Sequence, residues 1–341
     1  MFKIIKEIDS PEKIREYTPV PQELQLIKKK RDQEVIDIIS GKDSRLLLII
    51  GPCSADNENA VLEYVRRLSK LQEKVKDKIF IVPRIYTNKP RTRGEGYKGM
   101  LHQPDPNSAT DIQEGILALR RMHIHAIKES GLTAADEMLY PDNYAYVEDL
   151  LTYISIGARS SENQQHRLVC SGIELPVGVK NPMNGSMQVL INSIYATQIS
   201  NEFKYHHYQV QTEGNPYAHA ILRGSVDTNG VNISNYHYED VIKFSILYEK
   251  TGLKNPAIII DTNHSNSGKD AIQQIRIVNE VLNNKKHCPD FAKYFKGFLI
   301  ESYLLDGAQD IHGKDFGKSI TDSCLGWNKT EKLILQMADK L

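Results

Sequence analysis

The sequence lacks an excess of charge of either sign, a long apolar run and closely paired cysteines. Its 341 residues contain 43 Lys and Arg against 43 Asp and Glu, so the overall charge favours neither nucleic acid nor a membrane surface as a partner. The longest aliphatic run, residues 46–50, is far too short to span a bilayer. The N-terminus has no apolar core like that of a signal peptide. We therefore expect a cytoplasmic protein with no nucleic-acid or membrane partner.

The few cysteines exclude a disulfide framework. There are four, widely spaced and without a Cys-x-x-Cys pair: Cys53, Cys170, Cys288 and Cys324. In a reducing compartment such cysteines are expected to stay unpaired. Cys53 is unusual because it directly follows the aliphatic run 46–50 and a Gly-Pro turn. A thiol in that position could be a packing residue, a nucleophile or a metal ligand.

Short apolar runs alternate with amphipathic stretches along most of the chain. The runs predict eight strands, at 46–50, 79–86, 131–137, 153–159, 175–181, 219–224, 257–263 and 297–302. The stretches predict helices at 60–75, 108–130, 141–152, 161–171, 185–200, 236–250, 270–284 and 329–340. This alternation is typical of a (β/α)8 TIM barrel, an α/β fold, with an open doubly wound sheet as the alternative.

Two segments fall outside the alternation. Residues 21–40 predict a helix that precedes the first strand, with Pro21 near its start and Gly41 after its end. We therefore divide the chain into an N-terminal helical extension, residues 1–44, and a catalytic barrel, residues 45–341. The extension would serve oligomerisation and regulation, or else simply cover the bottom of the barrel. Residues 202–213 predict a β-hairpin inserted before the sixth strand.

The predicted strand ends carry ionisable side chains, and in barrels of this kind chemistry gathers at the C-terminal ends of the strands. Strands 2 to 6 and their loops supply one carboxylate and five cations: Glu137, Arg84, Lys89, Arg159, Lys180 and Arg223. Clustered cations repel one another in a cleft unless an anion joins them. Arginine forks suit phosphate and carboxylate oxygens. These residues therefore predict a small substrate with at least two anionic groups.

A second set of side chains comes from strands 1, 7 and 8 and the loop after strand 8. It comprises Cys53, His264, Glu301 and Asp322. In a closed barrel strand 8 lies beside strand 1, so the four side chains would be neighbours. Thiolate, imidazole and carboxylates are ligands for one divalent metal ion, which could be Mn, Fe, Co, Zn or Cu. A nucleophilic Cys53 beside His264 is the alternative, although nearby carboxylates would raise the pKa of the thiol.

The same residues lie in motifs that resemble those of type I 3-deoxy-D-arabino-heptulosonate 7-phosphate (DAHP) synthases, in the subgroup with an N-terminal regulatory extension. The motifs follow one another along nearly all of the barrel: GPCS (51–54), PRIYTNKPRT (83–92), YKG (97–99), IGARSSENQQHR (156–167), PVGVKN (176–181), ILRG (221–224), DTNHSNSGK (261–269), IES (300–302) and GKSITDSCLGW (317–327). KPRT together with SITDSCLGW is the most specific part of this resemblance.

The resemblance implies condensation of phosphoenolpyruvate with D-erythrose 4-phosphate to DAHP and phosphate, at the entry to the shikimate pathway and aromatic amino acid biosynthesis. The metal ligands of the family fall on Cys53, His264, Glu301 and Asp322. Its phosphoenolpyruvate-binding residues fall on Arg84, Lys89, Glu137, Arg159, Lys180 and Arg223. Its loop for erythrose 4-phosphate falls on Lys89, Pro90, Arg91 and Thr92.

The resemblance also implies roles and partners that the residues alone do not define. The metal would polarise the aldehyde, and Lys89 would give a proton to the developing alkoxide, with His264 acting through a water as the alternative. An aromatic amino acid effector and a homodimer or homotetramer are expected. Two other functions stay open: a 3-deoxy-octulosonate 8-phosphate synthase-like enzyme that uses phosphoenolpyruvate with another sugar, and a catalytically silent barrel that acts as a sensor or partner.

Overall fold

A parallel eight-stranded barrel forms the centre of the molecule. The computed structural model describes residues 1–91 and 93–341. The eight strands are β1 (Leu46–Gly51), β2 (Ile79–Pro83), β3 (Ala134–Met138), β4 (Leu151–Ile156), β5 (Val177–Lys180), β8 (His219–Leu222), β11 (Ile258–Asp261) and β12 (Phe295–Glu301). Their order is β2-β1-β12-β11-β8-β5-β4-β3. β1 therefore lies between β2 and β12. This confirms the prediction that the first and last strands of the barrel are neighbours.

The two outer strands of this order meet and close the barrel. Arg84, just beyond β2, forms a parallel bridge with Ala135 of β3. The amide of Ile85 donates to the carbonyl of Ala135 at 3.0 Å. Strand burial is nearly complete on both faces, which suits a barrel filled inside by side chains and covered outside by helices. The predicted TIM barrel is confirmed, and the open doubly wound sheet is wrong.

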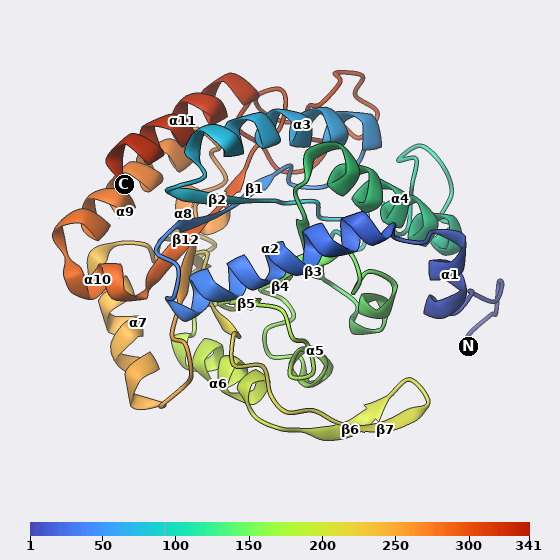
Figure 1. The fold of residues 1–341 in the computed structure, drawn as a ribbon, viewed down its shortest axis with the longest axis horizontal. Coiled ribbons are helices and arrows are strands. Elements are labelled where there is room, and N and C mark those ends of the chain that lie inside the picture. Colours follow the sequence, from blue (N-terminus) through green and yellow to red (C-terminus); the bar gives the residue numbers. More distant parts are fainter. Residues whose placement is uncertain (92) are drawn as a thin grey trace.

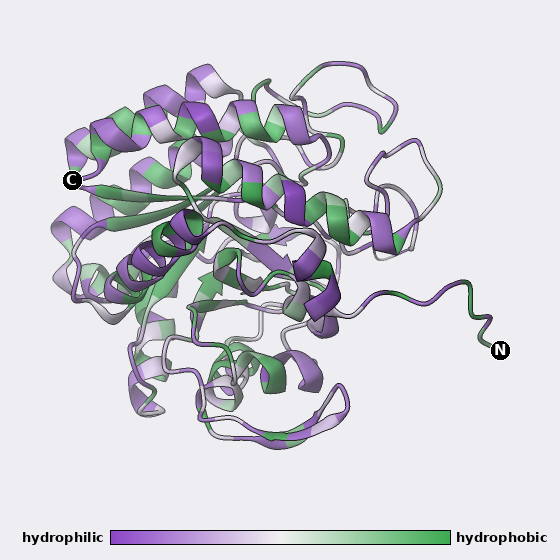
Figure 2. Cartoon of the chain, turned by 45° about the vertical axis from the view of Figure 1, so that its right-hand side comes forward, coloured by the Kyte–Doolittle hydropathy of each residue, from purple (hydrophilic) through white to green (hydrophobic). Residues whose placement is uncertain are grey.

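In the described part of the chain, seven helices that lie between or after the barrel strands in the sequence surround the barrel (Figure 1). They are α3 (Glu58–Val75), α4 (Ile112–Ser130), α5 (Gln164–Cys170), α6 (Met187–Gln198), α7 (Tyr238–Lys250), α9 (Gln273–His287) and α11 (Trp327–Lys340), and each overlaps a predicted helix. Apolar residues concentrate on the strands, while the outer helices alternate polar and apolar faces (Figure 2). In the described part of the chain, no helix is long and apolar enough to cross a membrane.

One predicted helix is wrong. Residues 141–152 form only a six-residue 3-10 helix, η1 (Pro141–Tyr146), because β4 already begins at Leu151. The space beside η1 is filled by the N-terminal segment. The hydroxyl of Tyr146 donates to the carbonyl of Asp9 at 2.9 Å, and Arg15 donates to the carbonyl of Ala145 at 2.8 Å. The N-terminal segment therefore takes part of the place that a full helix would occupy.

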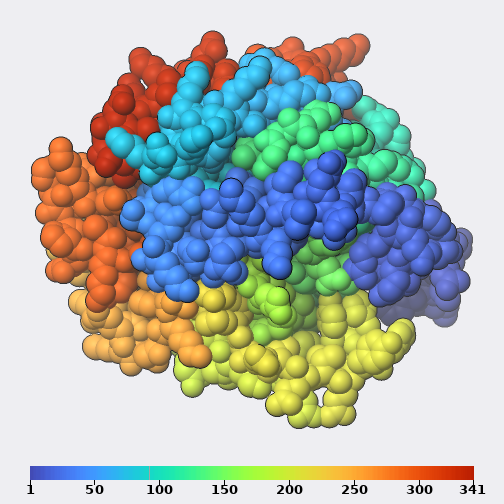
Figure 3. All heavy atoms as spheres, viewed as in Figure 1, coloured from blue at the N-terminus to red at the C-terminus, as the bar shows by residue number. Residues whose placement is uncertain are grey.

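The N-terminal extension forms α1 (Pro11–Tyr17) and α2 (Gln22–Ser40), and α2 lies across the barrel (Figures 1 and 3). Val35, Ile38 and other buried residues of α2 share one apolar cluster with side chains from the barrel interior. The guanidinium of Arg31 lies 4.2 Å from the ring centre of Phe80 and donates to the carbonyl of Ile81. α2 therefore covers the N-terminal end of the barrel. The predicted boundary at residue 44 falls in the turn before β1.

Several short strands and helices lie outside the barrel and its surrounding helices. The predicted hairpin is present as β6 (Glu202–Tyr205) and β7 (Tyr208–Gln211), and it projects away from the barrel (Figure 1). A second, smaller pair, β9 (Ser225–Val226) and β10 (Asn232–Ile233), follows the C-terminal end of β8. Two short helices, α8 (His264–Ser267) and α10 (Pro289–Tyr294), flank α9. The sequence patterns did not predict the second pair or the short helices.

Candidate active site

The predicted site residues gather at the C-terminal ends of the strands. Most of them line one cleft: Lys89, Pro90, Arg91, Glu137, Arg159, Lys180, Arg223, His264 and Asp322. Cys53, Arg84 and Glu301 lie beneath it, almost completely buried. Thr92 lies outside the described residues. These residues are spread between positions 53 and 322 of the sequence. The fold brings all of them that the structure describes to one end of the barrel.

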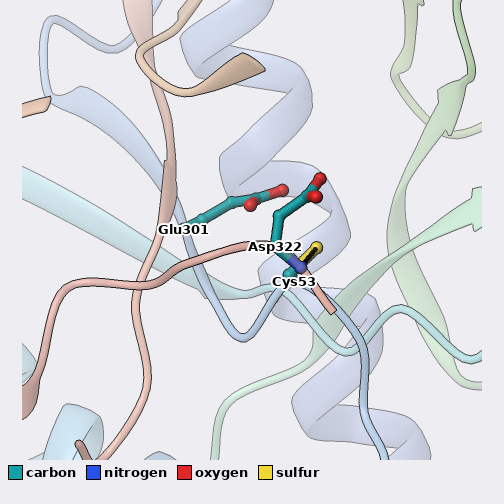
Figure 4. A group of neighbouring side chains, drawn as sticks. All are labelled: Cys53, Glu301 and Asp322. Atoms are coloured by element: carbon teal, nitrogen blue, oxygen red, sulfur yellow. Dashed lines mark hydrogen bonds between the residues drawn. The ribbon is translucent and has the colours of Figure 1, made fainter. Parts of the chain in front are cut away.

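Three of the four predicted metal ligands form a compact group. One potential ligand atom each from Cys53, Glu301 and Asp322 lies within 4.8 Å of the others, and the three side chains come from separate segments (Figure 4). The amide of Asp322 also donates to Sγ of Cys53 at 3.3 Å. Protein ligands bind such ions at about 2.0–2.3 Å, so one ion can bridge atoms separated by about twice that length. The spacing and the donor types fit a divalent metal.

His264 lies beside this group. Its Nε2 is 3.9 Å from Oε1 of Glu301, while its Nδ1 is 2.8 Å from Oδ2 of Asp261. Burial by itself would raise the pKa of Asp261, but the neighbouring His264, Lys180 and Arg223 outweigh burial and bring the pKa down to about 2. Asp261 is therefore a buried carboxylate that orients the imidazole with Nε2 toward the metal group, a common arrangement for metal-binding histidines.

Charge around the thiol argues against an unaided nucleophile. Burial raises the pKa of Cys53, and the carboxylate of Glu301 raises it further. Lys89 acts in the opposite direction, since its Nζ lies 2.6 Å from Sγ. The raised pKa keeps the thiol protonated unless a stronger positive charge joins it. A metal ion supplies such a charge, so the electrostatics of the site fit the ligand role better than the nucleophile role.

Arg84 supports the floor of the site. Its side chain is 1% exposed, and its Nη1 lies 2.8 Å from Oε1 of Glu301. It also donates to the carbonyl oxygens of Pro52 and Cys53, at 3.0 and 3.2 Å. The guanidinium lies 3.9 Å from the ring centre of Tyr86. Arg84 therefore fixes both the turn that carries Cys53 and the carboxylate of Glu301.

The cleft above this floor is strongly cationic. Six cations line it against the two carboxylates of Glu137 and Asp322: Lys89, Arg91, Arg159, Lys180, Arg223 and Lys269. Glu137 lies 3.8 Å from Lys180. Burial lowers the pKa of Arg223, and the nearby Arg159 acts in the same direction, while Asp261 acts against both. An anionic ligand with several oxygens would relieve the repulsion among the cations.

Several supporting residues were missed when candidate site residues were chosen from the sequence. Asp261 was visible at the end of a predicted strand, three residues before His264, but was given no role. Tyr86 carries Arg84 on its ring and also lies 5.4 Å from Nζ of Lys180. Asn263 donates to Oε2 of Glu301. Asp261 is a carboxylate at a strand end and could have been chosen on the same ground as the predicted ligands. For Tyr86 and Asn263 the only signal was their position next to predicted site residues, because uncharged side chains do not by themselves indicate a site.

Comparisons with known proteins agree with this geometry. A family model described as the DAHP synthetase I family matches residues 19–335. A phospho-2-dehydro-3-deoxyheptonate aldolase of Haemophilus influenzae is 36% identical over 343 aligned positions, which cover 98% of this chain and 92% of that protein. The Phe-sensitive aldolase of the same name from Escherichia coli is 35% identical, with 99% and 95% covered.

The fold is also similar to that of a solved structure. The phospho-2-dehydro-3-deoxyheptonate aldolase from Francisella tularensis SCHU S4 superposes with a TM-score of 0.92 at 30% sequence identity. The match covers 100% of this chain and 98% of that chain. Extension, barrel and hairpin are thus all included in the similarity. With matched sequence over nearly its whole length, the chain belongs to the DAHP synthetase I family.

Proposed function

We propose that the cationic cleft is the active site of a DAHP synthase and that its side chains bind the two phosphorylated substrates. As a family member, the chain is a transferase that condenses phosphoenolpyruvate with erythrose 4-phosphate in the first step of the shikimate pathway. The observation that carries the site assignment is the excess of six cations over two carboxylates in one cleft. Both substrates are anions with phosphate oxygens, which this lining is suited to bind.

The cations fall into two groups according to the part of the cleft from which they come, and we assign one substrate to each group. Arg159, Lys180 and Arg223 come from neighbouring strands and would hold the phosphate and carboxylate of phosphoenolpyruvate, with Glu137 pairing with Lys180. Lys89 and Arg91 lie on the loop after β2, and we assign both to erythrose 4-phosphate, although the resemblance also places Lys89 among the phosphoenolpyruvate-binding residues. Holding the two substrates in register can contribute on the order of 7–11 kcal/mol at best. C3 of phosphoenolpyruvate then bonds to the aldehyde carbon, water adds at C2, and the C2–O bond to phosphate breaks as the ketone forms.

Cys53, His264, Glu301 and Asp322 would hold one divalent metal ion. When bound, that ion supplies Lewis-acid polarisation of the sugar aldehyde. The mixed sulfur, nitrogen and oxygen set suits Mn, Fe, Co, Zn or Cu. The carboxylates and the thiolate would bind as anions, while Arg84 and Asn263 keep Glu301 in place.

Lys89 is our candidate for the proton donor. Burial opposes its charge, but Cys53 and Glu301 outweigh burial and raise the pKa of Lys89 well above its ordinary value. Its ammonium is therefore charged at neutral pH and faces the metal group, 2.6 Å from Sγ of Cys53. It would donate to the alkoxide oxygen that forms from the aldehyde. His264, acting through a water, is the alternative donor.

Metal removal with a matched pair of variants tests this proposal. We expect the chelator-treated protein to release no phosphate from the two substrates, and added divalent metal to restore release. Cys53→Ser should lower the metal content per chain, whereas Cys170→Ser, a buried thiol on α5, should not. Full activity in metal-free protein would contradict the metal role. Turnover only with a five-carbon sugar phosphate, or no turnover at all, would favour one of the two other functions.

We also propose feedback by an aromatic amino acid, because relatives carry the names Tyr-, Phe- and Trp-sensitive. A cavity beside the hairpin is lined by aromatic rings and carboxylates, among them Tyr144, Phe203, Tyr205 and Glu148. Rings and carboxylates suit an apolar side chain with an ammonium group. Inhibition assays with each of the three amino acids would test the proposal, and Glu148→Gln should weaken any inhibition found.

A homodimer or homotetramer is the assembly we propose. Large apolar side chains are exposed near the N-terminus and on the hairpin, including Phe2, Ile4, Ile5 and Tyr208. Exposed apolar groups at two projecting segments are typical of surfaces that another subunit covers. The mass of the intact protein in solution, measured by light scattering, would test it, and a monomer at all concentrations would contradict it.

A further inference from the structure

Asp136 is a buried acid next to the site, and neither the sequence motifs nor the proposed reaction gives it a role. It lies on β3 beside Glu137, and because side chains alternate along a strand, the two point in opposite directions. Glu137 faces the cleft, whereas Asp136 is 4% exposed and faces the start of the loop after β2. A buried acid at this position needs partners.

The partners of Asp136 are backbone and hydroxyl groups. Its Oδ1 accepts from the amide of Thr87 at 3.0 Å and from the amide of Glu137 at 2.7 Å. Its Oδ2 accepts from the hydroxyl of Thr87. All three donors are uncharged, so burial raises the pKa of Asp136 to about 7. Both protonation forms can keep the bond to the amide of Thr87.

The bonds from Thr87 to Asp136 continue the attachment of the chain to β3 beyond the point where the backbone hydrogen bonds between β2 and β3 end. The last backbone contact between the two strands is the bond from the amide of Ile85 to the carbonyl of Ala135. In a continued parallel ladder, the amide of Thr87 would pair with the carbonyl of Glu137. The carboxylate of Asp136 accepts that bond instead, so the chain after Ile85 can leave the sheet while remaining attached to β3.

Thr87 is the base of the substrate loop. Its carbonyl accepts from the amide of Leu101 at 3.2 Å, and two residues later the amide of Lys89 donates to the carbonyl of Lys98 at 3.0 Å. Gly99 packs so closely that a Cβ there would lie 2.3 Å from the carbonyl oxygen of Thr87. Both ends of the loop that carries Lys89 and Arg91 therefore meet at Thr87.

We propose that Asp136 is a positioning residue, which fixes Thr87 against β3 and thereby places Lys89 for the binding of erythrose 4-phosphate. The inference rests on the proposed function, because it takes Lys89 as a substrate-binding residue. It goes further by assigning the position of Thr87, at the base of the loop, to one side chain outside the cleft. In the described part of the chain, the side-chain bonds of Asp136 go to Thr87 and to the amide of Glu137, and none goes to Arg159, Lys180 or Arg223, which would bind phosphoenolpyruvate.

Steady-state kinetics of three variants tests the proposal. Asp136→Ala removes all three acceptor bonds and should raise KM for erythrose 4-phosphate at least about tenfold, while KM for phosphoenolpyruvate stays within about twofold. Asp136→Asn keeps an oxygen for the two amides and an NH2 for the hydroxyl of Thr87, so it should recover KM to within about threefold. The matched control is Asp32→Ala, which breaks a similar bond from Thr152 at 2.6 Å at the opposite end of the barrel. It should lower the melting temperature and leave both KM values unchanged.

The outcomes separate this inference from the proposed function. Wild-type protein that does not release phosphate from the two substrates refutes the function itself. Active wild type with an unchanged KM for erythrose 4-phosphate in Asp136→Ala refutes the positioning role alone. Equal rises in both KM values, matched by Asp32→Ala, would show a general structural effect and also refute it. Failure of Asp136→Asn to recover KM would refute the acceptor role.

Discussion

The buried histidine of α4 predicts how the stability of the protein depends on pH. His123 is 1% exposed, and within residues 1–91 and 93–341 neither ring nitrogen has a hydrogen-bond partner. Burial lowers the pKa of His123 from 6.5 to about 4, and the neighbouring Arg120 contributes in the same direction, only partly offset by Asp149. The imidazole is therefore neutral in the folded protein over the whole range in which it would take up a proton in the unfolded chain.

The sign and size of the effect follow from this difference. Below pH 6.5 the unfolded chain binds a proton that the folded protein does not, so stability falls as the pH falls, and the loss is complete below about pH 4. At pH 5 the two pKa values correspond to about 2 kcal/mol, and in the acid limit to about 3.4 kcal/mol. At pH 7 the effect is only about 0.2 kcal/mol. The loss therefore falls almost entirely between pH 7 and pH 4.

Replacing the imidazole isolates this contribution. Between pH 7 and pH 5 the free energy of unfolding should fall by about 2 kcal/mol less in His123→Leu than in wild type, as measured by denaturant unfolding at both pH values. His287→Gln is the control, because His287 is exposed at the end of α9 and should leave the difference between the two pH values close to that of wild type. The same loss between pH 7 and pH 5 in His123→Leu as in wild type would refute the reasoning.

Three further changes probe the site. Asp261→Asn should weaken divalent-metal binding about 10–100-fold, measured by competition with a chelator, because it loosens the imidazole of His264; unchanged affinity would count against this role. Lys180→Met should destabilise the protein by about 3–5 kcal/mol by leaving Glu137 buried without its cation, and adding Glu137→Met should restore stability but not activity, as followed by unfolding and phosphate release. Gly99→Ala, at φ +99°, should lower kcat/KM for erythrose 4-phosphate more than tenfold; wild-type kinetics would show that the loop adapts.

Much of the fold could be predicted from the sequence because several barrel strands are short, almost uniformly apolar runs. Residues 46–50 and 257–260 are such runs, and burial on both faces of a parallel strand requires them. The failure at residues 141–152 has a different cause. Its apolar pattern is consistent with a helix, but the place beside η1 is partly filled by a segment more than 100 residues earlier. The spacing of apolar residues within 141–152 cannot show that a segment far away in the sequence occupies the neighbouring space.

The site could be predicted in outline for a similar reason. Side chains at strand ends must share one rim once the barrel closes, which brings Cys53 to Glu301 across the junction of β1 and β12. The pattern could not predict which of these side chains are buried beneath the cleft and which line it. Arg84 and Lys89 are both cations near the end of β2, yet Arg84 is buried beneath the cleft and Lys89 lines it. Which of them meets solvent depends on how the loop returns at Gly99.

The helix that covers the barrel bottom limits how the N-terminal extension can be studied. Because Val35 and Ile38 pack with the barrel interior, a truncation that cuts into α2 would expose apolar core and unfold the enzyme rather than free it from control. A shortened protein intended to separate regulation from catalysis should begin before Gln22, where α2 starts. Deletions should also stop short of Asp9, because Asp9 and Arg15 contact η1 and its neighbours and Ile14 is buried in the core.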